Sequence, residues 1–182
     1  MHEDPIATSA ASERVRRLQG YILGLMSDAD KAELYKRYRD LFPVLEPVDV
    51  FGAFSGLMAD GIPPQRFLGV LNKVIKVLSV YLPPYSIDNA GPQGFIYELM
   101  KENEKYKAVL ERYKRLFAAE DNRDLVEILN DLAEELEDYE LHLLKKENIL
   151  FPLIENKSPV YDGFAIMWAL HDDFRKCMRE LR

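Results

Sequence analysis

Two histidines and a few acidic and phenolic side chains are the residues of this sequence that could do chemistry. His142 begins the segment 142–152, in which Glu147 follows and an apolar run ends in Phe-Pro. His171 lies on a different predicted helix, beside Trp168. Imidazole nitrogens bind protons and transition metals, and carboxylates balance the charge. If the two rings converge on one polar position in an apolar interior, the sequence predicts a site that handles a cation.

Each candidate side chain also has a structural interpretation. His171 fits a core histidine that is hydrogen-bonded to a carbonyl or a carboxylate, and Glu147 fits a solvated or capping residue. Glu102 fits a surface or salt-bridge residue, and Tyr97 fits a core aromatic whose hydroxyl reaches a partner or water. Cys177 has no base at motif spacing and is expected to be a small buried hydrophobe.

Composition excludes several classes of function. The chain has 182 residues, with 24 basic and 31 acidic side chains and a net charge of −7. A basic surface is what nucleic acids and anionic membranes need, so neither is expected as a partner. One cysteine fits a reducing cytoplasm. No signal peptide and no apolar run of bilayer length is visible, so we expect a cytoplasmic protein.

Apolar residues recur at three- and four-residue spacing through most of the chain, and no segment alternates like a strand. Ser27 and Gly61 are expected as an N-cap and a C-cap, and Pro152 is expected to kink or end a long helix. Helices are predicted over about 12–26, 27–41, 48–59, 64–82, 94–119, 123–150 (with a possible extension to 155) and 161–181. The fold class is therefore predicted as all-α, with an antiparallel helical bundle.

Prolines and glycines divide the predicted helices into parts. Residues 1–11 are polar and are predicted to be a disordered lead. Residues 12–83 are predicted to form a small helical domain. Three prolines and a glycine within 83–93 place a linker at 84–93, so 94–182 are predicted to form the bundle.

The C-terminal half, from about 90 to 182, resembles the hemerythrin-like (HHE cation-binding) domain. The segments that carry the resemblance are KENEKY (101–106), HLLKKENILFP (142–152) and MWALHDDFR (167–175). In one branch of that family a short helical domain of unknown function precedes this domain. Residues 40–82 resemble that preceding domain, including its acid-GIPP turn at 60–64.

The resemblance implies one or two iron ions held between four helices by histidines and bridging carboxylates. Carried over by position, His142 and His171 match two family histidines, and Tyr97 stands where another histidine is expected. Glu147 and Glu102 complete the candidate metal set. The implied function is iron binding for oxygen, nitric oxide or redox sensing rather than catalysis, with mono- or dinuclear iron as the cofactor.

Three departures from the family pattern favour a second interpretation. The bridging carboxylate usually lies four residues after the histidine, where this chain has Lys146; Glu147 is one position further and points about 100° away on an α-helix. The chain has only three histidines, and one of them is His2. The fourth helix of the family bundle is not found before Arg182.

The second interpretation is a metal-free module. The ammonium of Lys146 would stand where the metal would be, paired with Glu102, Glu135 or Asp173, since a buried lysine is costly unless it is paired. Such a module would form a homodimer or bind a signalling partner, because three helices leave an apolar groove to be covered.

A di-metal oxidase or peroxidase is a third possibility that needs a complete ligand set. No hydrolase, Walker or zinc motif is present in the sequence.

Overall fold

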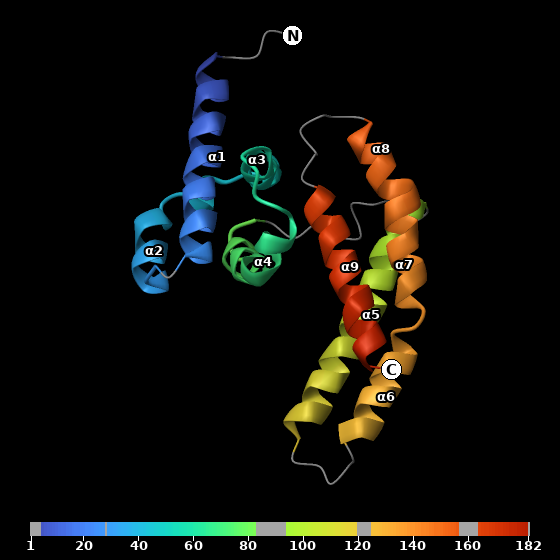
Figure 1. Cartoon of the computed structure of the whole chain (residues 1–182). Helices are drawn as coiled ribbons and strands as arrows, with labels where there is room; N and C mark the ends of the chain where they lie inside the picture. The colour runs from blue at the N-terminus through green and yellow to red at the C-terminus, as the bar shows by residue number, and fades with distance from the viewer. Residues whose placement is uncertain (1–4, 28, 83–93, 120–124, 157–163, 182) are drawn as a thin grey trace. The chain divides into compact units, whose positions relative to one another are not determined.

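The computed structural model describes residues 5–27, 29–82, 94–119, 125–156 and 164–181. Every regular element in these ranges is helical (Figure 1), which confirms the all-α prediction. Contacts divide the chain into two compact units, which we call unit 1 (1–84 and 153–170) and unit 2 (85–152 and 171–182). None of the described helices is both long enough and apolar enough to cross a membrane.

Some of the predicted domain boundaries lie outside the residues that the structure describes. The first helix begins at Pro5, inside the lead 1–11 that was predicted as disordered, and residues 1–4 lie outside the described residues. The linker predicted at 84–93 also lies outside them. The segment 153–170 groups with unit 1, although the sequence placed it in the C-terminal bundle.

Unit 1 is built around a central helix. The helix α1 (Pro5–Met26) packs against α2 (Lys31–Tyr38), α3 (Pro47–Ala59) and α4 (Gln65–Leu78). The 3-10 turn η1 (Phe42–Val44) joins α2 to α3. The apolar spacing along each helix puts one stripe inward. The largest fully buried apolar side chains of this core are Leu18, Ile22, Leu41, Phe42, Phe67 and Val74.

Two predicted helix caps have different outcomes. Asp30 caps α2, because its carboxylate accepts from the backbone N–H of Ala32 at 2.8 Å. The prediction of Ser27 as this cap was wrong, since its hydroxyl donates to the carbonyl of Gly24. Gly61 follows α3 with φ of 91°, a left-handed conformation that favours glycine, so its predicted role as a C-cap is confirmed.

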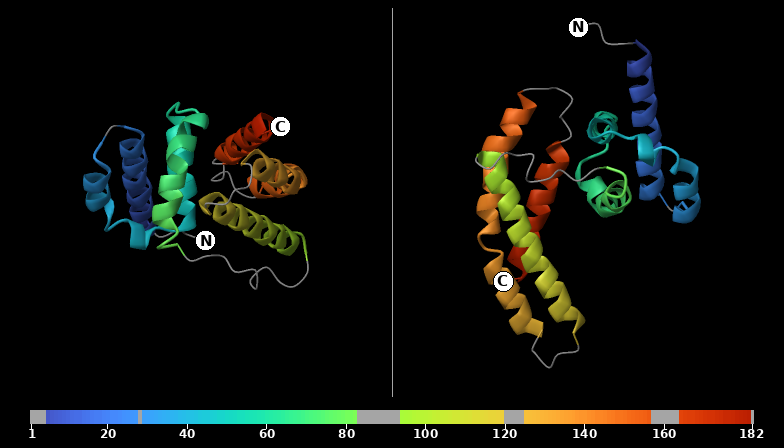
Figure 2. Two further views of the ribbon diagram at one scale, coloured as in Figure 1. Left: turned by 90° about the horizontal axis from the view of Figure 1, so that it is seen from below. Right: turned by 180° about the vertical axis from the view of Figure 1, so that it is seen from behind.

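Unit 2 is a set of three helical rods (Figure 2). The rod α5 (Phe95–Ala118) lies antiparallel to the rod formed by α6 (Leu125–Glu135) and α7 (Tyr139–Lys145). The second rod continues through a π-helical turn, η3 (Lys146–Leu150), into α8 (Phe151–Glu155), of which residues 151–152 belong to unit 2. The third is the C-terminal part of α9 (Phe164–Leu181), from His171 onward.

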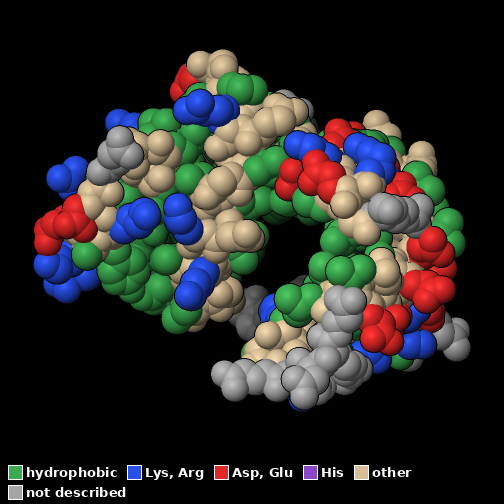
Figure 3. Space-filling model, turned by 60° about the horizontal axis from the view of Figure 1, so that its bottom comes forward, with side chains coloured by type: hydrophobic (Ala, Val, Ile, Leu, Met, Phe, Trp, Pro, Cys, Tyr) green, Lys and Arg blue, Asp and Glu red, His purple; other side chains and the backbone are tan. Residues whose placement is uncertain are grey.

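The second rod is not the continuous helix predicted over 123–150. Residues 136–138 form a turn in which backbone bonds reach back three residues, as from Tyr139 N–H to the Leu136 carbonyl at 3.0 Å. Glu134 lies three and four residues before Glu137 and Asp138, and like charges at this spacing destabilise an α-helix. Figure 3 shows acidic side chains gathered at the right-hand edge, where α6 and α7 lie.

The second interruption precedes Pro152. A proline has no N–H, and its ring clashes with the carbonyl four residues earlier. The backbone adapts by widening one turn, so that Phe151 N–H bonds to the carbonyl of Lys146 five residues back. Pro152 therefore distorts the rod, and helix α8 continues to Glu155.

Candidate functional site

Two histidine–glutamate pairs lie inside unit 2. His142 is 1% exposed, and its Nδ1 lies 2.8 Å from Oε2 of Glu102. His171 is 5% exposed, and its Nδ1 lies 2.7 Å from Oε1 of Glu147. The first pair joins α7 to α5, and the second joins η3 to α9. Each imidazole is therefore held by a carboxylate from a different rod.

Glu147 lies in η3, the π-helical turn. On a regular α-helix Glu147 would point away from the face of His142, as the sequence predicted. In the structure Glu147 reaches α9, where it accepts hydrogen bonds from His171 and Arg175. The Asn148 side chain supports the turn by donating to the carbonyl of Leu144 at 2.9 Å. The interpretation of Glu147 as a solvated residue was thus wrong: it is 6% exposed.

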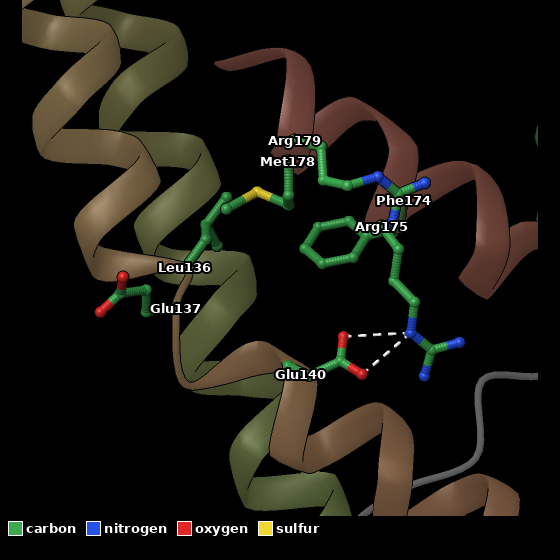
Figure 4. Close-up of a pocket in the computed structure, with 7 residues that line it drawn as sticks. All are labelled: Leu136, Glu137, Glu140, Phe174, Arg175, Met178 and Arg179. Carbon is green, nitrogen blue, oxygen red and sulfur yellow. Dashed lines mark hydrogen bonds and ion pairs between the residues drawn. The ribbon is translucent and has the colours of Figure 1, made fainter. Parts of the chain in front are cut away.

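Protein cations hold both interior carboxylates. The ammonium of Lys145 donates to Oε1 of Glu102. Arg175 Nη2 donates to Oε2 of Glu147 at 2.8 Å, and its Nε donates to both oxygens of Glu140, at 2.9 and 3.2 Å (Figure 4). Since a guanidinium binds carboxylates in a fixed geometry, Arg175 ties α9 to both η3 and α7.

These contacts set the charges of the two glutamates. Burial opposes ionisation of Glu102, but hydrogen bonds from Lys145 and His142 outweigh it and lower the pKa of this carboxyl. Burial also opposes ionisation of Glu147, and hydrogen bonds from Arg175 and His171 lower its pKa in the same way. Both side chains are carboxylates at neutral pH, so each accepts the hydrogen bond from its histidine.

Both imidazoles are neutral at pH 7. Burial lowers the pKa of His142 and of His171, and the nearby ammonium of Lys146 adds to the decrease in each. Burial lowers the pKa of Lys146 itself, and Glu102 partly offsets this. Lys146 therefore lies within electrostatic reach of both rings, one helical turn after His142. Among the described residues its ammonium makes no hydrogen bond or ion pair.

Aromatic rings enclose the two histidines. Tyr139 stacks on His142 with ring centroids 5.2 Å apart, and Phe151 stacks on His171 at 5.5 Å. The ring of Tyr106 lies 6.0 Å from that of His142. Because Nδ1 of His142 donates to Glu102, its Nε2 carries a lone pair, and this buried atom has no hydrogen-bond partner among the described residues.

The candidates named from sequence divide into two groups. The structure places His142, His171 and Glu147 in the interior of unit 2, with the half-buried Glu102 against His142, and His171 is bonded to a carboxylate. Tyr97 is half-buried, and the contact described for its ring is with the ammonium of Lys101, 5.5 Å from the centroid. It contributes to neither histidine–glutamate pair.

Several further sequence interpretations need correction or were incomplete. Glu135, considered as a partner of Lys146, instead bonds Tyr113 at 2.8 Å, and Asp173 is exposed. Cys177 is exposed rather than buried. Arg175 was missed as a site residue, although it lies four positions after His171 and therefore on the same helix face.

These observations define a class: a helical bundle in which facing rods present buried histidine and glutamate side chains to one another. The family comparison agrees with it. Residues 94–182 match the family model described as the hemerythrin HHE cation binding domain. The C-terminal half of this chain is therefore a hemerythrin domain, preceded by a helical N-terminal region, as the resemblance implied. Comparison with curated proteins and with solved structures finds no match for the chain.

The family implies a bound cation, but the side chains of the described part of the chain do not fit an iron centre. No three His, Cys, Asp or Glu side chains in that part are grouped so that they could hold a metal ion. Both carboxylates are engaged by Lys145 and Arg175. Lys146 adds a positive charge near both rings, which opposes binding of a metal cation. Among the described residues, Nε2 of His142 is a buried nitrogen whose lone pair has no partner.

Proposed function

We propose that this protein is a metal-independent helical module that acts through binding to a protein partner. The observation that supports this proposal is the engagement of the buried Glu147 and the half-buried Glu102 by the protein's own cations, Arg175 and Lys145. These ion pairs supply the positive charge that carboxylates need in an apolar interior. The domain then folds without a metal, and its function lies on its surface.

The proposal is tested by metal analysis and thermal unfolding of the full chain, purified from iron-supplemented cells. We expect far less than one equivalent of metal, and the same Tm with and without a chelator, because a ligand that binds only the folded state would raise Tm. The matched control is the double variant His142→Ala with His171→Ala, which should have the same metal content as the wild type. Stoichiometric metal that is lost in the double variant would contradict the proposal.

A second candidate function is iron-based sensing of oxygen, nitric oxide or redox state. One observation favours it: His142 donates its Nδ1 proton to Glu102 and leaves Nε2 buried and unpartnered. Metal-binding histidines characteristically make this kind of hydrogen bond to a carboxylate with their other nitrogen. Iron at about one equivalent, with a visible absorption band that is absent in His142→Ala, would support the sensor instead.

A further inference from the structure

The rod α5 carries an apolar face that unit 2 covers only in part. Tyr106, Leu110, Tyr113 and Phe117 recur at helical spacing along this rod. Tyr106 and Tyr113 are buried, whereas Leu110 is 44% exposed and Phe117 is 41% exposed. An apolar stripe that is covered along only part of its width marks a surface for association.

An apolar groove lies beside this stripe. It has a volume of about 420 Å³, and Leu110 of α5 lines one of its walls. Leu136, Tyr139 and Phe174, from the other two rods, also line it. The groove is thus bounded by all three rods of unit 2, and it is of a kind that accepts apolar side chains from a helix.

Charge is segregated between the two antiparallel rods. Residues 105–118 of α5 include five basic side chains and one acidic side chain. Residues 125–140, in α6 and the start of α7, include seven acidic side chains and no basic one. The acidic group follows the edge of unit 2 seen in Figure 3. Unit 2 therefore carries a net positive charge on this part of α5 and a net negative charge on α6 and the start of α7.

Contacts within one copy compensate part of this charge. On α5 the exposed side chains of Lys107 and Lys114 pair with Glu104 and Glu111 of the same helix, and such surface pairs are weak. Arg112 and Glu135 form an ion pair between the two rods. Glu127, Asp131 and Glu134 are exposed, and none of them forms an ion pair within the described residues. The remaining acidic charge on α6 is therefore available to a basic surface outside the copy.

We propose that the partner is a second copy of this chain, docked so that the basic face of α5 meets the acidic face of α6 of the other copy. A two-fold axis makes each contact twice, because residue i of one copy meets residue j of the other and the reverse. An acidic partner of another kind would use only the α5 face and leave the α6 charge uncompensated. The inference rests on the proposed function and names the partner.

The test is sedimentation velocity of the full chain at low and high salt. We expect a species of twice the 21.1 kDa chain mass at about 50 mM NaCl, and dissociation toward one chain at about 500 mM NaCl, because salt screens exposed charges. A single-chain mass at every concentration and at both salt levels would overturn the proposal.

Charge reversal locates the surface. Lys107→Glu with Lys114→Glu on α5, or Asp131→Lys with Glu134→Lys on α6, should each weaken association by about tenfold or more. The four substitutions together should restore it, because the two faces have then exchanged sign. Leu110→Gln should weaken it without any change of charge. Circular dichroism confirms that each variant remains helical.

The matched control is Lys73→Glu with Lys76→Glu on α4 of unit 1, which makes the same change in net charge at two exposed positions. Association equal to that of the wild type in this control supports the proposed surface. Equal weakening in the control and in the α5 variant, or no recovery in the combined variant, would overturn it. Metal analysis tests the proposed function independently, so each proposal can fail alone.

Discussion

The Oε1 atom of Glu147 lies 2.7 Å from Nδ1 of His171, although 24 positions separate the two residues in the sequence. The other oxygen of Glu147 accepts from Arg175, one helical turn after His171. A single buried carboxylate thus fixes the position of α9 on η3 through two neighbouring side chains. Glu147 makes both contacts from η3, the π-helical turn that begins at Lys146.

Replacing Glu147 is expected to destabilise unit 2 more than any nearby surface change. In Glu147→Gln the guanidinium of Arg175 loses its buried charge partner, and the expected loss is about 3 kcal/mol of unfolding free energy. Urea denaturation followed by circular dichroism measures it. The control is Glu140→Gln, which removes a partly exposed carboxylate from the same arginine and should cost less than about 1 kcal/mol. Equal losses would mean that burial of Glu147 contributes nothing.

Removing the charge of Lys146 is expected to stabilise the protein. Its ammonium is partly buried and makes no described ion pair. Lys146→Met keeps a side chain of similar length and removes the desolvation cost of the charge, so the free energy of unfolding should rise by about 1 kcal/mol. The pKa of His142 and of His171 should rise, since a nearby positive charge is gone; NMR titration of the rings measures this. Lys145→Met is the control and should destabilise, because Glu102 loses a hydrogen bond. Lower stability of Lys146→Met would contradict the prediction.

Stability is expected to fall in two stages on acidification. Both histidines have a pKa below their ordinary value of 6.5 in the folded state, so below about pH 6.5 the unfolded chain binds more protons and unfolding is favoured. Glu102 and Glu147 also have a lowered pKa when folded. Their contribution is complete above their unfolded pKa, about 4.3, and is lost as pH falls through the folded values.

Urea unfolding from pH 7.5 down to about pH 2 measures both stages, because the second lies below the unfolded pKa of the glutamates. Each histidine contributes at most about 1.4 kcal/mol per pH unit to the slope of the unfolding free energy against pH. The double variant His142→Gln with His171→Gln should lose the first stage and keep the second. A wild-type stability that stays constant from pH 7 to pH 5.5 would show that the two rings are not buried as neutral groups.

The Asn148 side chain is expected to stabilise the π-helical turn. In Asn148→Ala the carbonyl of Leu144 loses a hydrogen bond of 2.9 Å, which should cost about 1 kcal/mol. Amide hydrogen exchange should quicken within 146–151, while the core of unit 1 keeps its protection. Faster exchange throughout both units would indicate global destabilisation rather than a local effect on this turn.

Helical periodicity determined much of this protein without any coordinates. The spacing of apolar residues identified the all-α class, and the segments around His142 and His171 identified the family of the C-terminal half, which the family comparison confirms. Local chemistry also predicted the cap at Gly61, because φ of a single residue depends on its immediate neighbours.

Only the tertiary structure determined how the interior charges are arranged. Glu147 was interpreted as solvated because its own helix does not reveal that His171 and Arg175 of α9 would cover it. Arg175 was overlooked because its carboxylate partners come from other helices, and a pattern within one helix does not reveal which rods will meet. The sequence by itself determined which side chains this interior contains, and the packing of three rods decided that lysine and arginine hold its carboxylates.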